Sequence, residues 1–202
     1  ILVRGKTVMA GDSRKPEATA EAFEEGWLRT GDIGVLEDGY LTITDRIKEL
    51  MKTSGGKYIA PQYVESTLAG DPYIEQIIVI ADGRPYATAL IVPAFEVLEA
   101  YAKTWRIAYS SREELVRDPI IVRFFEGRVE ARQKELAGYE KVKRIALLPR
   151  PFSQEAGELT PTLKVKRRIV IDRHQDLIDA MYARGKEVST PAPESDLPFS
   201  TP

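Results

Sequence analysis

The residues best suited to chemistry are three charged side chains, Asp32, Arg46 and Lys164, each within a distinctive short segment. Asp32 follows Gly31, and its carboxylate offers two acceptor oxygens that could receive hydrogen bonds from both hydroxyls of a ribose. Arg46 could donate to the same sugar or pair with Asp32 across a hairpin, although an exposed ion pair alone adds little stability. A lone Thr-Gly-Asp triplet is more often an ordinary turn, because glycine and aspartate are common turn residues.

Lys164 lies in the segment Leu159-Thr160-Pro161-Thr162-Leu163-Lys164-Val165-Lys166-Arg167. A flexible ammonium group can reach two anionic oxygens and stabilise the charge that develops as a leaving group departs. The nearby Gly157 and Pro161 indicate a mobile loop. The alternative is that the cations from Lys164 to Arg168 form a solvated basic face.

The segment Thr53-Ser54-Gly55-Gly56-Lys57 is not a Walker phosphate loop. Such a loop needs a glycine at the position of Met51, and a serine or threonine where Tyr58 follows the lysine. Gly55 and Gly56 are instead expected to permit a tight turn and a close approach of backbone.

Composition excludes several other classes of protein. The 202 residues include 29 basic and 31 acidic side chains, so no excess of positive charge favours nucleic acid as a partner. The absence of cysteine excludes disulfides and thiolate metal sites. His174, the single histidine, has no neighbour at ligand spacing, so we expect a surface or helix-terminal residue and assign no metal site. No apolar run approaches the roughly 20 residues that cross a bilayer.

Residues 1–46 are expected to be β-rich. We predict a strand over residues 1–10, a helix over 16–25 and extended segments at 27–28 and 33–36. The Asp-Gly pair at 38–39 lies between apolar runs, which is a strong hairpin signal. The apolar opening without an initiator methionine resembles the middle of a sheet, so we expect a fragment of a longer protein.

The pattern changes after Asp45. Proline and apolar spacing predict helices that start near residues 61, 95 and 118, the last reaching about residue 136. The buried face of this third helix should carry Ile121, Phe124 or Phe125, and Val129. Strands are expected at 74–81, 86–93 and 142–148, and a final helix around residues 177–182. Irregular alternation of helices and strands predicts a small α+β domain.

The order Thr30-Gly31-Asp32, Asp45-Arg46-Ile47-Lys48-Glu49-Leu50 and the Lys164 segment resembles the last third of an adenylate-forming acyl-CoA synthetase. Long-chain fatty-acid–CoA ligases are the most similar branch. The helical insertion between residues 95 and 136 also favours this branch over luciferase-like or short-chain relatives. Such enzymes join a carboxylate to AMP and then pass the acyl group to coenzyme A. Many relatives have glycine where Leu163 stands, whereas long-chain members share the Thr-Pro-Thr-x-Lys form.

The resemblance implies a role for six residues. Asp32 and Arg46 would contact the ribose of ATP, Lys48 would be the interdomain hinge, Gly55 and Gly56 would line the coenzyme A channel, and Lys164 would catalyse adenylation. It also implies magnesium with ATP, although no metal ligand can be named.

The same resemblance predicts the domain organisation. Residues 1–46 would be the tail of a large N-terminal AMP-binding domain, 47–186 a mobile C-terminal α+β domain, and 187–202, with four prolines, a disordered tail. The expected partners are a fatty acid, ATP, coenzyme A and the missing N-terminal domain, in a cytoplasmic enzyme for which peripheral membrane contact stays open.

Two alternatives remain. The protein could be a fatty-acyl-AMP ligase that loads a carrier protein, or a non-catalytic partner-binding module. Retention of Asp32, Arg46 and Lys164 together argues against the second alternative. The chain alone is expected to be inactive, because the phosphate loop and the acyl pocket of this family lie upstream.

Overall fold

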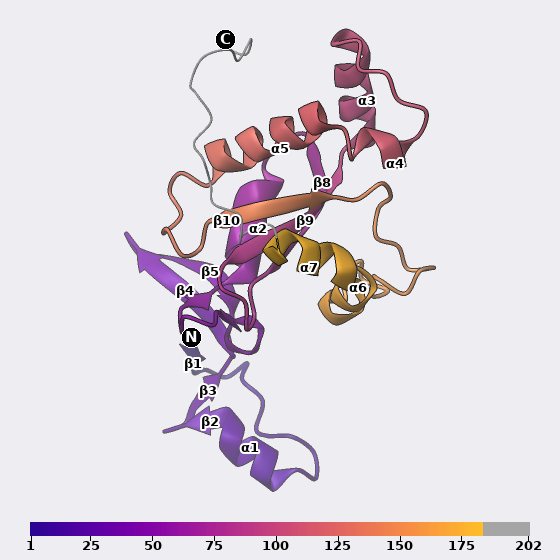
Figure 1. Cartoon of the computed structure of the whole chain (residues 1–202). Coiled ribbons are helices and arrows are strands. Elements are labelled where there is room, and N and C mark those ends of the chain that lie inside the picture. The colour runs from indigo at the N-terminus through magenta and orange to yellow at the C-terminus, as the bar shows by residue number, and fades with distance from the viewer. Residues whose placement is uncertain (184–202) are drawn as a thin grey trace.

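The computed structural model describes residues 1–183, which form two parts of different character (Figure 1). The expectation of disorder over residues 187–202 lies outside the described residues. Both helices and sheets are present, so the α+β prediction is confirmed.

The first part, residues 1–46, consists of short strands and one helix. Its elements are β1 (Leu2–Val3), α1 (Pro16–Ala22), β2 (Phe23–Glu24), β3 (Trp27–Arg29), β4 (Asp32–Glu37) and β5 (Tyr40–Arg46). β3 is the central strand of one antiparallel sheet, between β1 and β2, whereas β4 and β5 form a separate hairpin. No side chain from residue 1 to residue 44 is buried, so this part contributes nothing to the hydrophobic core.

Two tight turns shape this part. Asp38 and Gly39 have φ values of 50° and 83°, and Glu25 and Gly26 have values of 49° and 81°. Positive φ at both central residues is typical of the type I′ turn, whose twist matches that of the strands it connects. The predicted hairpin at Asp38-Gly39 is therefore confirmed, and a second one precedes it.

A β-bulge interrupts the β4–β5 hairpin. The register shifts between Ile33 and Gly34, which leaves Thr44 of β5 without a strand partner. Beyond this bulge Asp32 lies opposite Arg46. A side chain at Gly34 would stand 2.6 Å from a backbone carbonyl of the facing strand, so the close approach requires glycine.

The second part begins with small elements and continues into a sheet covered by helices. Its elements are η1 (Ile47–Glu49), β6 (Met51–Lys52), β7 (Tyr58–Ile59), α2 (Pro61–Ala69), β8 (Ile74–Ile80), β9 (Ala87–Pro93), α3 (Phe95–Thr104), α4 (Arg112–Leu115), α5 (Pro119–Arg132), β10 (Val142–Leu147), α6 (Arg167–Arg173) and α7 (Gln175–Ala183).

The central sheet has the strand order β10-β9-β8, in which β8 is antiparallel and β10 parallel to β9. Every residue of β9 is buried, as expected for a strand covered on both faces. Figure 1 shows α7 in front of this sheet and α2 behind it, with α5 running along β10. The buried hydrophobic core extends from Met51 to Met181 and lies entirely within this second part.

The helices follow the predicted patterns at their starts more closely than at their ends. The carboxylate of Asp118 accepts hydrogen bonds from the N–H groups of Ile120 and Ile121, which caps α5 as expected. Phe125 rather than Phe124 is the fully buried aromatic of this helix. α5 ends at Arg132, because the buried Gln133 side chain turns to bond the backbone of β10 at both the N–H and the carbonyl of Val142.

Two predictions in the first part were wrong in extent. The strand expected over residues 1–10 is limited to Leu2–Val3, because β3 offers a short partner and a turn joins Val8 N–H to the Gly5 carbonyl. The helix expected over 16–25 ends at Ala22, because the next two residues pair with β3. The short elements η1 and α4 were not predicted, since neither spans enough residues to show apolar periodicity.

Candidate functional site

The Thr30-Gly31-Asp32 triplet forms a turn in which each residue has a structural role. The Thr30 hydroxyl accepts a hydrogen bond from the Asp32 N–H at 3.0 Å. Gly31 has a φ of 76° and its carbonyl accepts from the Ile47 N–H at 2.8 Å. This turn therefore connects the start of β4 with the end of β5.

Asp32 and Arg46 are brought together by the strand register. Arg46 Nε donates to Asp32 Oδ1 at 3.0 Å, and the two side chains are 63% and 20% exposed, respectively. Exposure limits the stability that the pair provides. The arrangement leaves a carboxylate and a guanidinium together at the surface, where both remain accessible to a ligand.

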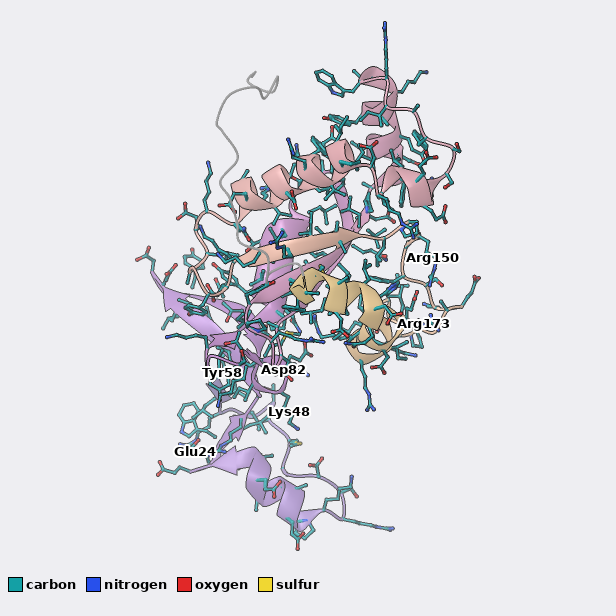
Figure 2. All side chains as sticks on the ribbon, in the orientation of Figure 1. Glu24, Lys48, Tyr58, Asp82, Arg150 and Arg173 are labelled. Carbon is teal, nitrogen blue, oxygen red and sulfur yellow. The ribbon has the colours of Figure 1, made fainter. Side chains whose placement is uncertain are left out.

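Lys48 lies in the 3-10 helix η1 and its side chain is exposed (Figure 2). Hydrogen bonds connect the residues that precede this helix with the start of α2, which follows it. Asp45, only 1% exposed, accepts from the N–H groups of Arg46 at 2.6 Å and of Gln62 at 3.1 Å. The Gln62 amide also donates to the Glu49 carboxylate. Asp45 thereby joins the end of β5 to the start of α2 across Lys48, a function that the sequence analysis missed.

The glycine-containing segment 53–57 is a tight turn between β6 and β7. Thr53 N–H donates to the Lys57 carbonyl, and Gly56 N–H donates to the Thr53 carbonyl, both at 2.9 Å. Gly56 has a φ of 79°, which favours glycine, whereas Gly55 does not lie in the left-handed region. The expected tight turn is confirmed.

This turn is attached to the connection between β8 and β9. Ser54 N–H donates to the Arg84 carbonyl at 2.9 Å, and Lys52 N–H donates to the carboxylate of Asp82. The Arg84 side chain in turn pairs with Asp179 of α7 at 2.8 Å. The glycine turn is therefore attached to the β8–β9 connection, which is linked in turn to α7.

Lys164 is exposed on a small loop that is closed by its own backbone. Thr160 N–H donates to the Lys164 carbonyl at 2.8 Å, and the Thr160 hydroxyl accepts from the Lys164 N–H at 3.0 Å. Leu159 and Val165 form an antiparallel bridge at the base of the loop. Leu163 has a φ of 61° and is 68% exposed, so leucine occupies a left-handed conformation that glycine would adopt at lower cost. Within residues 1–183, no salt bridge engages the Lys164 ammonium.

The basic segment after Lys164 does not form a single solvated face. Arg167 is 26% exposed and donates to both oxygens of Glu65 in α2 and to the Val79 carbonyl in β8. Arg168, in contrast, is 95% exposed. Arg167 therefore anchors the first residue of α6 to the domain core.

His174 lies between α6 and α7, which confirms the expected helix-terminal position. Burial lowers its pKa below the ordinary value of 6.5, and the charges of Arg150 and Arg173 act in the same direction. Glu158 opposes this shift because a negative charge favours the imidazolium. The described residues contain no cluster of three histidine or acidic side chains that could hold a metal ion.

No hydrogen bond or ion pair within residues 1–183 joins Lys164 to Asp32 or Arg46. Figure 1 shows the β4–β5 hairpin and the segment that precedes α6 in separate regions of the molecule. Of the six residues selected from the sequence, the structure thus pairs Asp32 with Arg46 and leaves Lys164 apart from them. No helix in the described part of the chain is long and apolar enough to cross a membrane.

Residues 48–186 match the family described as the AMP-binding enzyme C-terminal domain. The chain belongs to this family. It is 39% identical over 184 residues to the long-chain-fatty-acid–CoA ligase FadD15 of Mycobacterium tuberculosis, covering 90% of this chain and 31% of that protein. It is also 34% identical over 193 residues to fatty acyl-CoA synthetase A of Dictyostelium discoideum, covering 92% and 29%. The chain therefore spans about a third of the length of these relatives.

Solved structures of AMP-binding enzymes share the fold. The adenylation domain of a carboxylate reductase from Mycobacterium chelonae superposes with a TM-score of 0.69 at 27% identity, covering 90% of this chain and 27% of that one. The corresponding domain from Segniliparus rugosus, in complex with AMP and a co-purified carboxylic acid, gives 0.68 at 26% identity, covering 91% and 28%. The resemblance to adenylate-forming enzymes is confirmed.

Proposed function

We propose that this chain is the C-terminal portion of a long-chain fatty-acid–CoA ligase. In the first half-reaction a fatty-acid carboxylate attacks the α-phosphorus of ATP and releases diphosphate. In the second, the sulfur of coenzyme A attacks the acyl carbon and releases AMP. The observation that carries the proposal is the 39% identity to FadD15 over 90% of the chain, together with an exposed Lys164 whose charge no other described residue engages.

Lys164 would act in the first half-reaction. The attacking carboxylate and the triphosphate are both anionic, so a cation is needed where they meet. An ammonium group at the end of a long side chain can contact both and stabilise the charge that develops on diphosphate. Its position on an exposed loop suits a residue that is delivered to a site formed largely by another domain.

Asp32 and Arg46 would hold the ribose of ATP. The Asp32 carboxylate retains an oxygen that is not bonded to Arg46 Nε, and Arg46 has further guanidinium donors. Together they offer acceptors and donors on one side of a sugar ring. Their mutual pairing would keep both side chains oriented before the nucleotide arrives.

Lys48 would be the hinge, and the turn with Gly55 and Gly56 would line the coenzyme A channel. A hinge requires a few residues that absorb a change in φ and ψ, and η1 is a three-residue connection between the two parts. The bonds that Asp45 and Gln62 form across η1 would be exchanged when the domain rotates. Attachment of the glycine turn to Arg84 would make the turn move with the C-terminal domain.

The proposed reaction also needs an N-terminal domain, magnesium and the substrates, none of which residues 1–183 include. A large N-terminal domain would cover residues 1–46, where apolar side chains such as Leu36 and Ile43 are 69% and 62% exposed. Magnesium would accompany ATP, but the described residues offer no ligand cluster, so none is assigned to the ion. We place the enzyme in the cytoplasm, with peripheral membrane contact as a route by which a long-chain substrate could enter.

The test is the product formed by the complete enzyme. We expect ATP, palmitate and coenzyme A to give palmitoyl-CoA, AMP and diphosphate, detected by mass spectrometry and by a diphosphate assay. Palmitoyl-AMP that accumulates with coenzyme A present, but transfers to an acyl carrier protein, would instead identify a ligase that loads a carrier. Absence of any adenylate with fatty acids of 8 to about 20 carbons would contradict the proposal.

A further inference from the structure

Glu158 is a buried carboxylate that the proposed reaction does not use directly. Its side chain has no exposed surface. Glu158 Oε1 accepts from Arg150 at 3.1 Å and from Arg173 at 2.9 Å, and Oε2 accepts from Arg150 at 3.1 Å and from the Ser153 N–H at 3.2 Å. Figure 2 shows Arg150 and Arg173 on the same side of the domain, beside α6.

These bonds connect three separate elements. Arg150 follows the end of β10, Ser153 belongs to the segment that leads to the Lys164 loop, and Arg173 is the last residue of α6. Burial alone would raise the pKa of Glu158, but the hydrogen bonds from Arg150, Arg173 and Ser153 outweigh it and lower the pKa. The group is therefore an ionised carboxylate with four donors.

The backbone of Glu158 also closes the loop that carries Lys164. Lys166 N–H donates to the Glu158 carbonyl at 2.7 Å, next to the bridge between Leu159 and Val165. Glu158 therefore lies at the start of the loop in the chain, and its carbonyl is hydrogen-bonded to Lys166 at the end of the loop. Lys164 projects from a loop whose base is fixed at Glu158.

We propose that Glu158 is a positioning residue that holds the Lys164 loop in the orientation needed for adenylation. This inference rests on the proposed role of Lys164. The orientation of the Glu158 carboxylate is fixed, because its bidentate pairing with Arg150 aligns the planes of the carboxylate and the guanidinium. An uncharged amide at this site would place N–H donors against arginine donors, so the loop base would shift.

The test compares Glu158→Gln with Asp71→Asn in the complete enzyme. Asp71 is a matched control because it is 3% exposed, pairs with Arg128 at 2.8 Å and accepts from the Tyr73 N–H. No hydrogen bond or ion pair within residues 1–183 joins Asp71 to residues 157–167. Both variants should lose thermal stability, but only Glu158→Gln should speed hydrogen exchange of the amides of Thr160, Lys164 and Lys166.

Kinetics give the second measurement. We expect Glu158→Gln to lower kcat for adenylation about 10- to 100-fold, as a misplaced catalytic group would, with little change in KM for ATP or in acyl transfer from palmitoyl-AMP. Glu158→Gln combined with Lys164→Ala should be no slower than Lys164→Ala alone, since the glutamate acts through the lysine.

Two results would overturn the inference. One is unchanged exchange at residues 160–166 in Glu158→Gln, and the other is an additive loss in the double variant. A Lys164→Ala enzyme with normal adenylation would instead contradict the proposed role of Lys164, and the exchange measurement would still decide whether Glu158 fixes the loop. The two failures are therefore distinguishable.

Discussion

At the scale of single residues, Lys164 combines a fixed backbone with a free side chain. Its N–H and carbonyl are both bonded to Thr160, whereas its ammonium is exposed and unpaired within residues 1–183. An ammonium group is most available to an anionic substrate when no carboxylate of the protein pairs with it. The Lys164 ammonium has no such partner within residues 1–183.

We expect Lys164→Ala in the complete enzyme to slow adenylation about 10²- to 10³-fold, the usual loss when one donor to developing charge is removed. Transfer from pre-formed acyl-AMP to coenzyme A lacks the repulsion between carboxylate and triphosphate, so it should change little. Diphosphate release and thioester formation measure the two steps separately. Equal slowing of both would indicate general structural support.

Leu163 permits a second prediction at this scale. A left-handed conformation costs a residue with a β-carbon about 1–2 kcal/mol, while glycine costs about 0.5–1 kcal/mol in unfolded-state entropy. Because Leu163 is also 68% exposed and loses few contacts, Leu163→Gly should leave the chain equally stable or up to about 1 kcal/mol more stable. Urea unfolding measures this, and a clear destabilisation would show that the leucine side chain packs usefully.

The pH dependence of stability provides a third prediction. The pKa of His174 is lowered in the folded chain, so the unfolded chain binds its proton more readily. The related stability is complete above pH 6.5 and is lost as the pH falls through the lowered folded value. We expect the free energy of unfolding to fall between pH 7.5 and 5.5, and to fall less in His174→Gln. His174 is the single histidine, so the same decline in both chains would exclude it as the cause.

At the scale of elements, η1 is the three-residue connection at which we propose that the two parts move relative to each other. The φ values typical of a 3-10 helix lie near those of proline, and proline is tolerated in the first turn of a helix. We therefore expect Lys48→Pro in the complete enzyme to retain the arrangement seen here.

Lys48→Pro should leave one half-reaction near its normal rate and abolish the other, because only one of two domain orientations remains accessible. We expect adenylation to survive. Lys48→Ala is the control for loss of the charge and should be mild in both steps. Identical behaviour of the two variants would move the hinge away from Lys48.

Elements with local signals were predictable from sequence, and those defined by distant contacts were not. The Asp38-Gly39 turn and the Asp118 cap depend on residues within a few positions of one another. The start of α6 depends on Arg167 reaching Glu65, 102 residues away in the chain. The burial of Glu158 depends likewise on Arg150 and Arg173, so a loop glutamate in the sequence gave no sign of its surroundings.

At the scale of the whole molecule, the candidate site is divided between a well-packed domain and a part without a core. Within residues 1–183 all buried hydrophobic side chains lie between Met51 and Met181, yet Asp32 and Arg46 lie outside that range. Sequence motifs could therefore select the candidate residues, but no contact within residues 1–183 brings Lys164 to Asp32 and Arg46.

We expect the purified 202-residue chain alone to form no acyl-adenylate. It holds candidate contacts for ribose and a candidate catalytic lysine but no surface that brings them together, so the positioning that accelerates reaction is lost. Diphosphate release from ATP and palmitate should equal that of a heat-treated sample. Release above this background would mean that residues 1–202 suffice.

Thr44 has no partner residue in the register of the β4–β5 hairpin, and this irregularity determines which charged residue faces Asp32. If the register of the outer part of the hairpin continued unbroken, the residue opposite Asp32 would be Asp45, and two carboxylates would face each other. The extra residue shifts the phase of β5 by one position. Arg46 then faces Asp32, while Asp45 is rotated to the opposite side of the strand, where α2 begins. The one-residue bulge at Thr44 therefore places Arg46 at the surface beside Asp32, and Asp45 in the buried connection between the two parts.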